Sequence, residues 1–183
     1  MSFLAEYLKH PFTIGAVAPS SKYLAKKMLR NVTFNQARVI IEYGLGTGVF
    51  TEEIIKRKKP ETVFLIIENN PVFYKKLKEK YESECNVKIE LGSAEDVEKY
   101  MEKWKIKRAD YVISGLPFAS LPKSVSKAIL TATGKILDAN GYFITFQYTL
   151  FKKKIFENYF KIKDISLEWV NLPPAFVLTM KNN

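Results

Sequence analysis

The sequence predicts an α/β fold, with one seven-stranded, mostly parallel sheet and helices on both faces. From Arg38 onward, short β-branched runs alternate with charged amphipathic segments, which is the pattern of strand–helix–strand units. Such units connect through right-handed crossovers and place their strands parallel. The last two β-rich runs follow each other too closely for a helical crossover. We therefore expect them to form an antiparallel pair at one edge of the sheet.

Each predicted strand is a short run rich in β-branched and aromatic residues. The strand candidates are Val39–Glu42, Val63–Ile67, Val87–Leu91, Tyr111–Ile113, Tyr142–Phe146, Ile165–Trp169 and Phe176–Met180. The intervening amphipathic segments predict helices, among them Pro71–Tyr81, Ala94–Trp104 and Lys123–Leu137. Seven strands fit a single twisted sheet, and 183 residues suit a single domain.

The segment 1–35 differs in character from the α/β core, 36–183, and is predicted to form an N-terminal helical cap. Apolar residues with helical spacing indicate two helices, one with Phe3, Leu4, Tyr7 and Leu8 and one with Leu24, Ala25, Met28 and Leu29. Pro11 ends the first helix, and Pro19-Ser20-Ser21 supplies an N-cap for the second.

The composition favours anionic partners. Lysine and arginine total 29 against 19 acidic residues, a formal net charge of +10, which suits nucleic acid, acidic lipid or phosphorylated substrates. The plainer alternative is that lysine-rich stretches such as Lys152–Lys154 are solvated helix surfaces. The single cysteine and single histidine argue against a disulfide and a histidine-rich metal site. Without a secretory pattern or an apolar run of ~20 residues, the chain is expected in the cytoplasm, where it can contact the inner face of the membrane.

The most informative stretch runs from Val39 to Gly48, where a buried strand leads directly into three alternating glycines and then an amphipathic helix. Glycine permits positive φ and close backbone approach, so Gly44, Gly46 and Gly48 can wrap a ligand and offer N–H groups at the helix. The spacing GxGxG departs from the GxGxxG of dinucleotide-binding folds and lacks the GK[ST] ending of a P-loop. The loop therefore suits a nucleoside or a carboxylate-bearing ligand.

Two carboxylates flank this turn. Glu42 precedes the loop, where it would repel a pyrophosphate and attract the ammonium group of a methionine moiety. Glu68 follows the next predicted strand, where an acidic group can bind both ribose hydroxyls, although a surface or capping role is the alternative. The charge pattern favours S-adenosylmethionine over NAD.

A third strand end carries Gly92-Ser93-Ala94-Glu95-Asp96, whose small and polar side chains can border an adenine ring. The alternative is helix capping, with Ser93 as the N-cap and Asp96 completing a capping box. The two roles can coexist.

These features resemble the class I methyltransferases, whose sheet is Rossmann-like, and within them the bacterial phospholipid N-methyltransferases that act on phosphatidylethanolamine. The resemblance covers nearly the whole chain and is carried by Gly15 to Ser21 with Leu24-Ala25, Glu42 to Gly48, Ser114-Gly115-Leu116-Pro117-Phe118, and Asn171 to Phe176. The ribosomal RNA adenine N6-dimethylases are also similar. Their strand-end motif needs asparagine where this chain has Ser114-Gly115, and no additional helical RNA-binding domain follows the last predicted strand, so RNA is the second choice.

The resemblance implies a site for S-adenosylmethionine. Its candidate residues are Ser20, Ser21, Glu42, Gly44, Gly46, Thr47, Gly48, Glu68, Asn69, Ser93, Ala94, Glu95 and Ser114. The glycine loop would line the methionine end, Glu68 would hold the ribose, and Ala94 with Glu95 would border the adenine. Ser20 and Ser21 would close over the cofactor, with helix capping as the alternative.

Methyl transfer requires a neutral amine held in line with the sulfonium methyl group, and it needs neither a metal nor a covalent nucleophile. The candidate catalytic residues are Ser114, Gly115, Leu116, Pro117 and Phe118. Their backbone carbonyls could accept the amine hydrogens, and Phe118 could favour the cation that forms on nitrogen. The alternative is that Pro117 stops the strand and Phe118 packs in the core. No residue stands out as a general base.

Three hypotheses follow for function. The first is a phosphatidylethanolamine N-methyltransferase at an anionic membrane surface, contacted through the Phe3–Leu8 helix and the basic faces of Lys22, Lys26, Lys27 and Arg30. The second is an RNA adenine methyltransferase, and the third is a non-catalytic module that keeps the ligand-binding fold. No metal and no obligate protein partner are expected.

Overall fold

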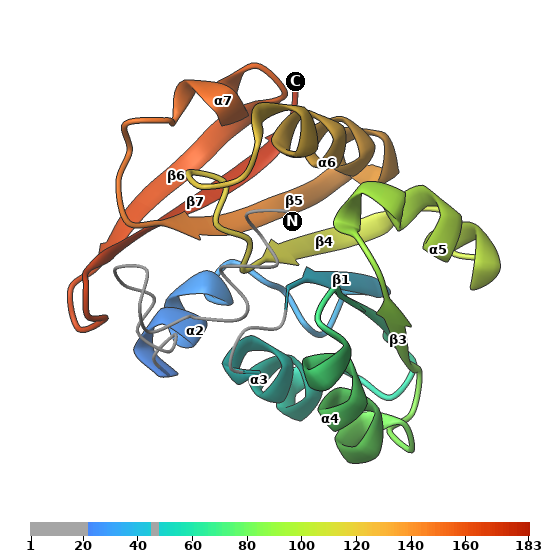
Figure 1. The fold of residues 1–183 in the computed structure, drawn as a ribbon. Helices are drawn as coiled ribbons and strands as arrows, with labels where there is room; N and C mark the ends of the chain where they lie inside the picture. Colours follow the sequence, from blue (N-terminus) through green and yellow to red (C-terminus); the bar gives the residue numbers. More distant parts are fainter. Residues whose placement is uncertain (1–21, 45–47) are drawn as a thin grey trace.

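The computed structural model describes residues 22–44 and 48–183. Its centre is a seven-stranded sheet with the order β3-β2-β1-β4-β5-β7-β6 (Figure 1). The strands are β1 (Val39–Tyr43), β2 (Val63–Glu68), β3 (Val87–Leu91), β4 (Ala109–Ser114), β5 (Leu137–Gln147), β6 (Phe160–Glu168) and β7 (Ala175–Asn182). The predicted α/β sheet is thereby confirmed.

The antiparallel pair at the sheet edge is also as predicted. Strands β1 to β5 pair in parallel, whereas β7 is antiparallel to both β5 and β6. The chain inserts β7 between β5 and β6, so β6 is the edge strand. As a result β6 runs in the same direction as β1 to β5, and the ends of all six strands lie at one edge of the sheet. We call this the carboxyl edge and the opposite one the amino edge.

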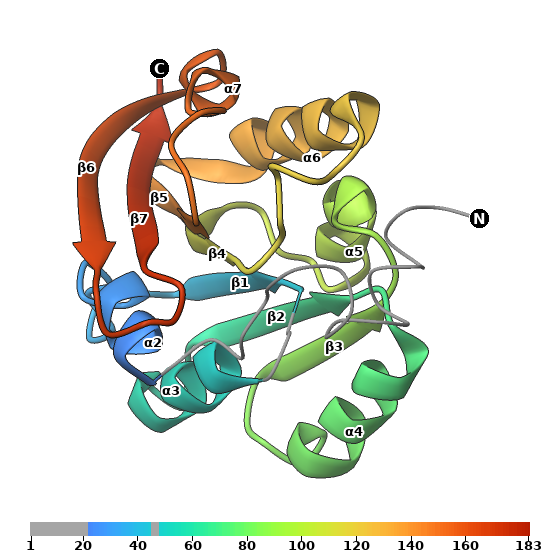
Figure 2. The same cartoon turned by 60° about the vertical axis from the view of Figure 1, so that its left-hand side comes forward.

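Helices cover both faces of the sheet (Figures 1 and 2). One face carries α2 (Lys22–Met28), α3 (Val49–Arg57) and α4 (Pro71–Tyr81), and the other carries the 3₁₀ turn η1 (Ala94–Asp96), α5 (Val97–Lys103), α6 (Lys123–Ile136) and α7 (Lys154–Glu157). Because side chains alternate along a strand, Phe64 and Ile66 of β2 join the core on the first face, and Leu65 and Ile67 join the core on the second. Burial on both faces explains why the central strands are continuous apolar runs.

The largest differences from the predicted elements lie in the second half of the chain. β6 begins at Phe160 rather than Ile165 and ends before Trp169, because apolar and polar residues already alternate from Phe160 onward. β5 begins at Leu137, directly after α6. The segment predicted as one helix from Ala94 begins with η1 and continues as α5. The short helix α7 was not predicted.

The helix α2 packs on the first face through its apolar side chains. Leu24, Ala25 and Met28 are fully buried in the same core as β1 and β2. Lys27 Nζ lies 3.7 Å from a carboxylate oxygen of Glu168 at the end of β6. The first helix expected for the cap lies outside the described residues, and the division into a cap 1–35 and a core 36–183 stays a prediction.

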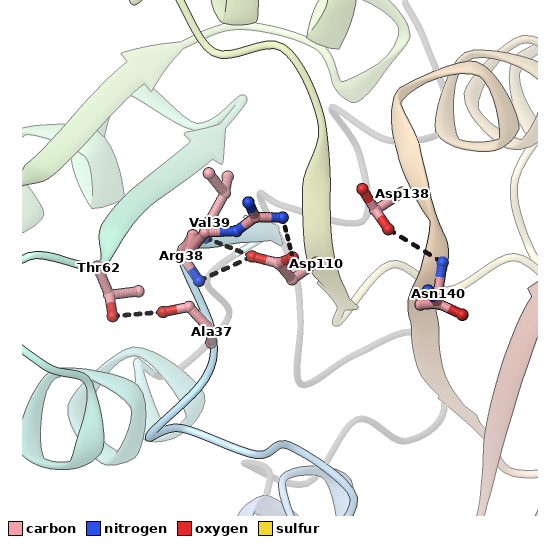
Figure 3. Close-up of polar contacts among 7 residues, drawn as sticks. All are labelled: Ala37, Arg38, Val39, Thr62, Asp110, Asp138 and Asn140. Atoms are coloured by element: carbon pink, nitrogen blue, oxygen red, sulfur yellow. Dashed lines mark hydrogen bonds and ion pairs between the residues drawn. The ribbon is translucent and has the colours of Figure 1, made fainter.

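Polar side chains form hydrogen bonds with backbone groups where the strands begin (Figure 3). Asp110 Oδ2 accepts hydrogen bonds from the backbone N–H groups of Arg38 (2.7 Å) and Val39 (2.9 Å). The Arg38 guanidinium lies 3.6 Å from Asp110 Oδ1. The Thr62 hydroxyl donates to the Ala37 carbonyl at 2.7 Å, and Asp138 Oδ1 accepts from the Asn140 N–H. These contacts fix the starts of β1, β2 and β4 relative to one another.

Among residues 22–44 and 48–183, no helix combines the length and apolar character that a bilayer crossing requires.

Candidate active site

The end of β1 buries a carboxylate with an incomplete set of partners. Glu42 is fully buried, and its Oε2 accepts a hydrogen bond from the Thr51 hydroxyl of α3 at 2.7 Å. Its Oε1 is also buried and has no hydrogen-bond partner among the described residues. Burial raises the pKa of Glu42 from 4.5 to about 8; the Thr51 hydrogen bond lowers it, and the nearby charge of Glu68 raises it further. The unpaired oxygen marks a place for a donor or a cation.

Glycines bring the ends of β1 and β4 into close contact. Gly44 has a φ of 69°, in the region that favours glycine. A Cβ on Gly115 would lie 2.7 Å from the Gly44 carbonyl oxygen, and the Gly115 N–H donates to the Tyr43 carbonyl at 2.9 Å. A side chain at either glycine would fill the space where the two strand ends meet. Gly48, with a φ of 78°, precedes α3.

A second acidic residue lies on the adjacent strand. Glu68 is buried at the end of β2, and Glu42 pairs in register with Ile66, two residues earlier on that strand. The two side chains therefore point to the same face of the sheet. Glu68 Oε1 accepts from the Asn70 N–H at 2.7 Å, whereas Asn69 is exposed. The two predicted carboxylates are thus brought together at the carboxyl edge.

At the end of β3, Ser93 caps η1. Its hydroxyl oxygen accepts from the Glu95 N–H at 3.2 Å and lies 3.0 Å from Glu95 Oε2. The capping role expected as an alternative is confirmed, but the carboxylate that meets Ser93 belongs to Glu95 rather than Asp96. Asp96 contributes its backbone N–H to the Ser93 carbonyl. Ala94 is buried. A contact of these residues with adenine stays a prediction.

The segment after β4 divides into a buried part and a partly exposed part. Ser114 is fully buried, and its carbonyl accepts from the Thr145 hydroxyl at 3.1 Å. Gly115, Leu116 and Pro117 are partly exposed. The Leu116 carbonyl accepts from the Phe118 N–H.

The structure puts the ring of Phe118 in the core, as the packing alternative expected. The ring is buried and makes edge contacts with Phe143 and Phe156. Direct contact of Phe118 with a substrate stays a prediction.

Sequence reasoning missed two residues at this edge, Thr51 and Gln147, and the close packing around Gly92. Thr51 holds Glu42 from the first turns of α3. Gly92 has no room for a side chain, because a Cβ would lie 1.9 Å from the Tyr100 hydroxyl. Gln147 is buried at the end of β5, and its Nε2 has no hydrogen-bond partner among the described residues. Only Gln147 had a local signal, namely a polar residue ending an apolar strand.

Four predicted cofactor residues, Ser20, Ser21, Gly46 and Thr47, lie outside the described residues. Within the described part of the chain, no group of three or more histidine, cysteine and acidic side chains could hold a metal ion.

The geometry fits a ligand that carries a cation at one end and a nucleoside at the other. The unpaired Glu42 oxygen suits an ammonium group. The close approach of β1 and β4 leaves no room for a side chain at Gly115, and Glu68 lies on the neighbouring strand, where ribose hydroxyls would meet it. These three features match S-adenosylmethionine.

Comparison with known proteins agrees with this match. A family model described as ribosomal RNA adenine dimethylase matches residues 16–157. An ornithine lipid N-methyltransferase from Singulisphaera acidiphila is 31% identical over 175 residues, which cover 94% of this chain and 91% of the relative.

Solved structures share the fold at low identity. The fibrillarin of Methanococcus jannaschii superposes with a TM-score of 0.69 at 16% identity, covering 90% of this chain and 76% of that one. The fibrillarin of Aeropyrum pernix, crystallised with natively bound S-adenosylmethionine, gives a TM-score of 0.65 at 15% identity and covers 78% of this chain and 66% of that one. About a third of the second fibrillarin therefore lies outside the match.

Proposed function

Because the chain belongs to the ribosomal RNA adenine dimethylase family and is an S-adenosylmethionine-dependent methyltransferase, we propose that it methylates the amine headgroup of a membrane lipid. The observation that carries the proposal is the 31% identity to an ornithine lipid N-methyltransferase across 94% of the chain. Ethanolamine and ornithine headgroups both offer a primary aliphatic amine. We propose phosphatidylethanolamine and ornithine lipid as the two candidate substrates.

For the cofactor, the proposal assigns a role to each end of the site. Glu42 would bind the ammonium group through its unpaired Oε1, and Thr51 would hold the carboxylate in place. Glu68 with Asn69 would meet the ribose, and Ser93, Ala94 and Glu95 would border the adenine. Gly44, Gly46, Thr47 and Gly48, with Ser20 and Ser21, would surround the methionine end. When bound, S-adenosylmethionine supplies an electrophilic methyl group.

For the acceptor amine, the proposal assigns the segment from Ser114 to Phe118. Three of its carbonyls already accept hydrogen bonds: that of Ser114 from the Thr145 hydroxyl, that of Leu116 from the Phe118 N–H, and that of Pro117 from the Ser120 and Leu121 N–H groups. The Gly115 carbonyl is therefore the favoured acceptor for an amine hydrogen. Orienting the nitrogen lone pair toward the methyl group is the main task of this segment, because such positioning accounts for much of the barrier reduction in a displacement reaction.

A second candidate is RNA adenine methylation. It is favoured by the family model, which is described by that activity and matches residues 16–157. Ser114-Gly115 argues against it, because the RNA enzymes that this chain resembles use asparagine at that point.

One labelling experiment tests both candidates. The full chain is incubated with methyl-labelled S-adenosylmethionine and one acceptor: phosphatidylethanolamine vesicles, ornithine-lipid vesicles or ribosomal RNA. We expect label in one or both lipids and none in RNA. Label in RNA alone would overturn the lipid proposal. The number of methyl groups added follows from chromatography of the labelled lipid.

A further inference from the structure

The loop between β6 and β7 exposes large apolar side chains in a cluster. Trp169, Val170 and Leu172 are 74%, 62% and 79% exposed. Tyr23 of α2 is 58% exposed and lies one helical turn from Lys27, the residue that reaches Glu168 at the end of β6. Figures 1 and 2 both show α2 beside this loop. We call Tyr23, Trp169, Val170 and Leu172 the rim patch.

The loop holds these side chains outward through its own polar contacts. Glu168 Oε1 accepts from the Val170 N–H at 3.0 Å, and the Asn171 side-chain amide donates to the Pro173 carbonyl at 2.8 Å. Asn171, between the exposed Val170 and Leu172, is itself buried. The polar residue therefore faces inward and the apolar ones face outward, the reverse of the usual arrangement in a surface loop.

The rim patch lies at the same edge of the sheet as the candidate active site. Glu168 pairs with Ala175, and the next residue, Phe176, pairs with Gln147 at the end of β5. On its other side, β5 pairs with β4, and Thr145 of β5 lies opposite Ser114 at the end of β4. Three strand spacings separate β4 from β6, so the patch lies roughly 15 Å from the acceptor segment. A surface touched by the patch would also lie near the point of methyl transfer.

Charge identifies the partner. The helix α2 carries Lys22, Lys26 and Lys27 and no acidic residue. The segment that follows β5 at the same edge exposes Phe151, 90% accessible, followed by Lys152–Lys154. Exposed tryptophan and aliphatic side chains flanked by lysines match the interface of an anionic bilayer, where aromatic rings lie at headgroup depth and cations meet acidic lipid.

We propose that the rim patch docks the protein on an anionic lipid bilayer, with Trp169, Val170 and Leu172 entering the headgroup region beside the active site. This inference rests on the proposed lipid substrate and extends it. It assigns membrane contact to a surface made by the β6–β7 loop and α2. The sequence suggested the basic residues of α2 together with the Phe3–Leu8 helix, and the β6–β7 loop is the new part of the surface.

The chain contains two tryptophans, which allow a direct test. Emission of the wild-type chain and of the Trp169→Phe variant is recorded with phosphatidylglycerol–phosphatidylcholine vesicles, which lack a primary amine, and with phosphatidylcholine vesicles. We expect a blue shift and reduced acrylamide quenching in the wild type with the anionic vesicles, and neither change in Trp169→Phe, whose remaining Trp104 follows α5. Unchanged wild-type emission, or absence of vesicle binding, would overturn the docking proposal.

A second measurement uses the variant Trp169→Ser/Val170→Ser/Leu172→Ser, with Val72→Ser on α4 as the control because Val72 is 59% exposed and outside the patch. We expect vesicle sedimentation of the triple variant to weaken at least about tenfold, with cofactor affinity by calorimetry unchanged and Val72→Ser like the wild type. Equal sedimentation of the triple variant and the wild type would contradict the proposal.

The two proposals fail separately. Insertion of Trp169 into the bilayer without label in any lipid would support the docking surface and contradict the proposed lipid substrate. Label in lipid while Trp169 stays in water would support the lipid substrate and contradict the docking surface.

Discussion

The two edges of the sheet treat their acidic groups in opposite ways. At the amino edge, Asp110 is paired with two backbone N–H groups and the Arg38 guanidinium. At the carboxyl edge, Glu42 has one partner, Thr51, and a buried oxygen with none among the described residues. Both carboxylates sit at ends of the central strands β1 and β4. The difference separates a carboxylate that builds the fold from one that is available to a ligand.

This difference has an energetic cost. Burying a charged group without full compensation is unfavourable, and the protein meets that cost by holding a proton on Glu42, which has a pKa of about 8. A ligand cation would take over the role of that proton. Without the ligand, the carboxyl edge is therefore less stable than it would be with Glu42 fully paired. Five predictions test the contrast between Glu42 at the carboxyl edge and Asp110 at the amino edge.

The largest effect is expected from Glu42→Gln. The glutamine side chain keeps the shape and can accept from Thr51, but it loses the charge that would face the ammonium group. We expect the affinity for S-adenosylmethionine to fall about 100-fold, consistent with loss of a buried charge-assisted hydrogen bond. Isothermal calorimetry measures the change. Wild-type affinity in this variant would contradict the role assigned to Glu42.

The same variant should not lose stability at alkaline pH. The pKa of Glu42 is raised in the folded state, from 4.5 to about 8, so its contribution to stability is fully present below pH 4.5 and is lost as pH rises through 8. The amide of Glu42→Gln does not titrate, so the variant lacks this loss. Each tenfold difference in proton affinity is worth roughly 1.4 kcal/mol, so cofactor-free Glu42→Gln should melt higher than the wild type at pH 8 to 9.

The next effect is expected from Gly115→Ala. The added Cβ would meet the Gly44 carbonyl oxygen at 2.7 Å, so the two strand ends must separate. We expect kcat/KM to fall about tenfold or more, since small misplacements of reacting groups are costly, with a stability loss of about 1–3 kcal/mol.

Gly134→Ala in α6 is the matched control, because its Cβ would make only ordinary contacts, at 3.7 Å from Asn182 and 3.9 Å from Phe160. Alanine is also favoured over glycine in a helix. We expect unchanged kinetics in Gly134→Ala. An equal loss of activity in both variants would contradict the claim that the close contact at Gly115 is needed for activity.

A smaller effect is expected from pH. Because cofactor-free Glu42 has a pKa of about 8 and the bound form must be ionised, cofactor binding between pH 6 and 8 should release a proton. Affinity should rise with pH by up to about tenfold per pH unit in that range. Calorimetry in buffers of different ionisation enthalpy counts the proton, and Glu42→Gln should release none from this position.

Residues at the two edges could be predicted from the sequence where their role shows in the residues next to them along the chain. The strands β1, β2 and β4 were predictable because strands buried on both faces are largely apolar runs, and Glu42 with Gly44 stood out because they lie at the end of such a run. Thr51 was missed because its hydroxyl reaches Glu42 only when α3 packs on the sheet. The pairing of Asp110 with Arg38 joins residues 72 positions apart and has no local signal.

Side-chain direction was the least predictable property. Phe118 follows a strand-end motif, but its ring packs on Phe143 and Phe156, which are far away in the sequence. Trp169 was predicted inside a strand and lies in the loop after β6, where it is exposed. In both cases tertiary packing, rather than the residue type, decides whether an aromatic ring lies in the core or in solvent.

The smallest effect on activity is expected at the amino edge, from Asp110→Asn. Asparagine keeps one acceptor but presents an amide donor to N–H groups that need an acceptor, and it loses the ion pair with Arg38. We expect unfolding in urea to show a loss of about 1–3 kcal/mol, while cofactor affinity and kcat at a temperature well below melting stay at wild-type values. Asp110 joins the starts of β1 and β4 and is expected to make no contact with the ligand, so it can change cofactor affinity only by changing the fold. A loss of affinity comparable to that of Glu42→Gln would therefore show that the two edges of the sheet are coupled.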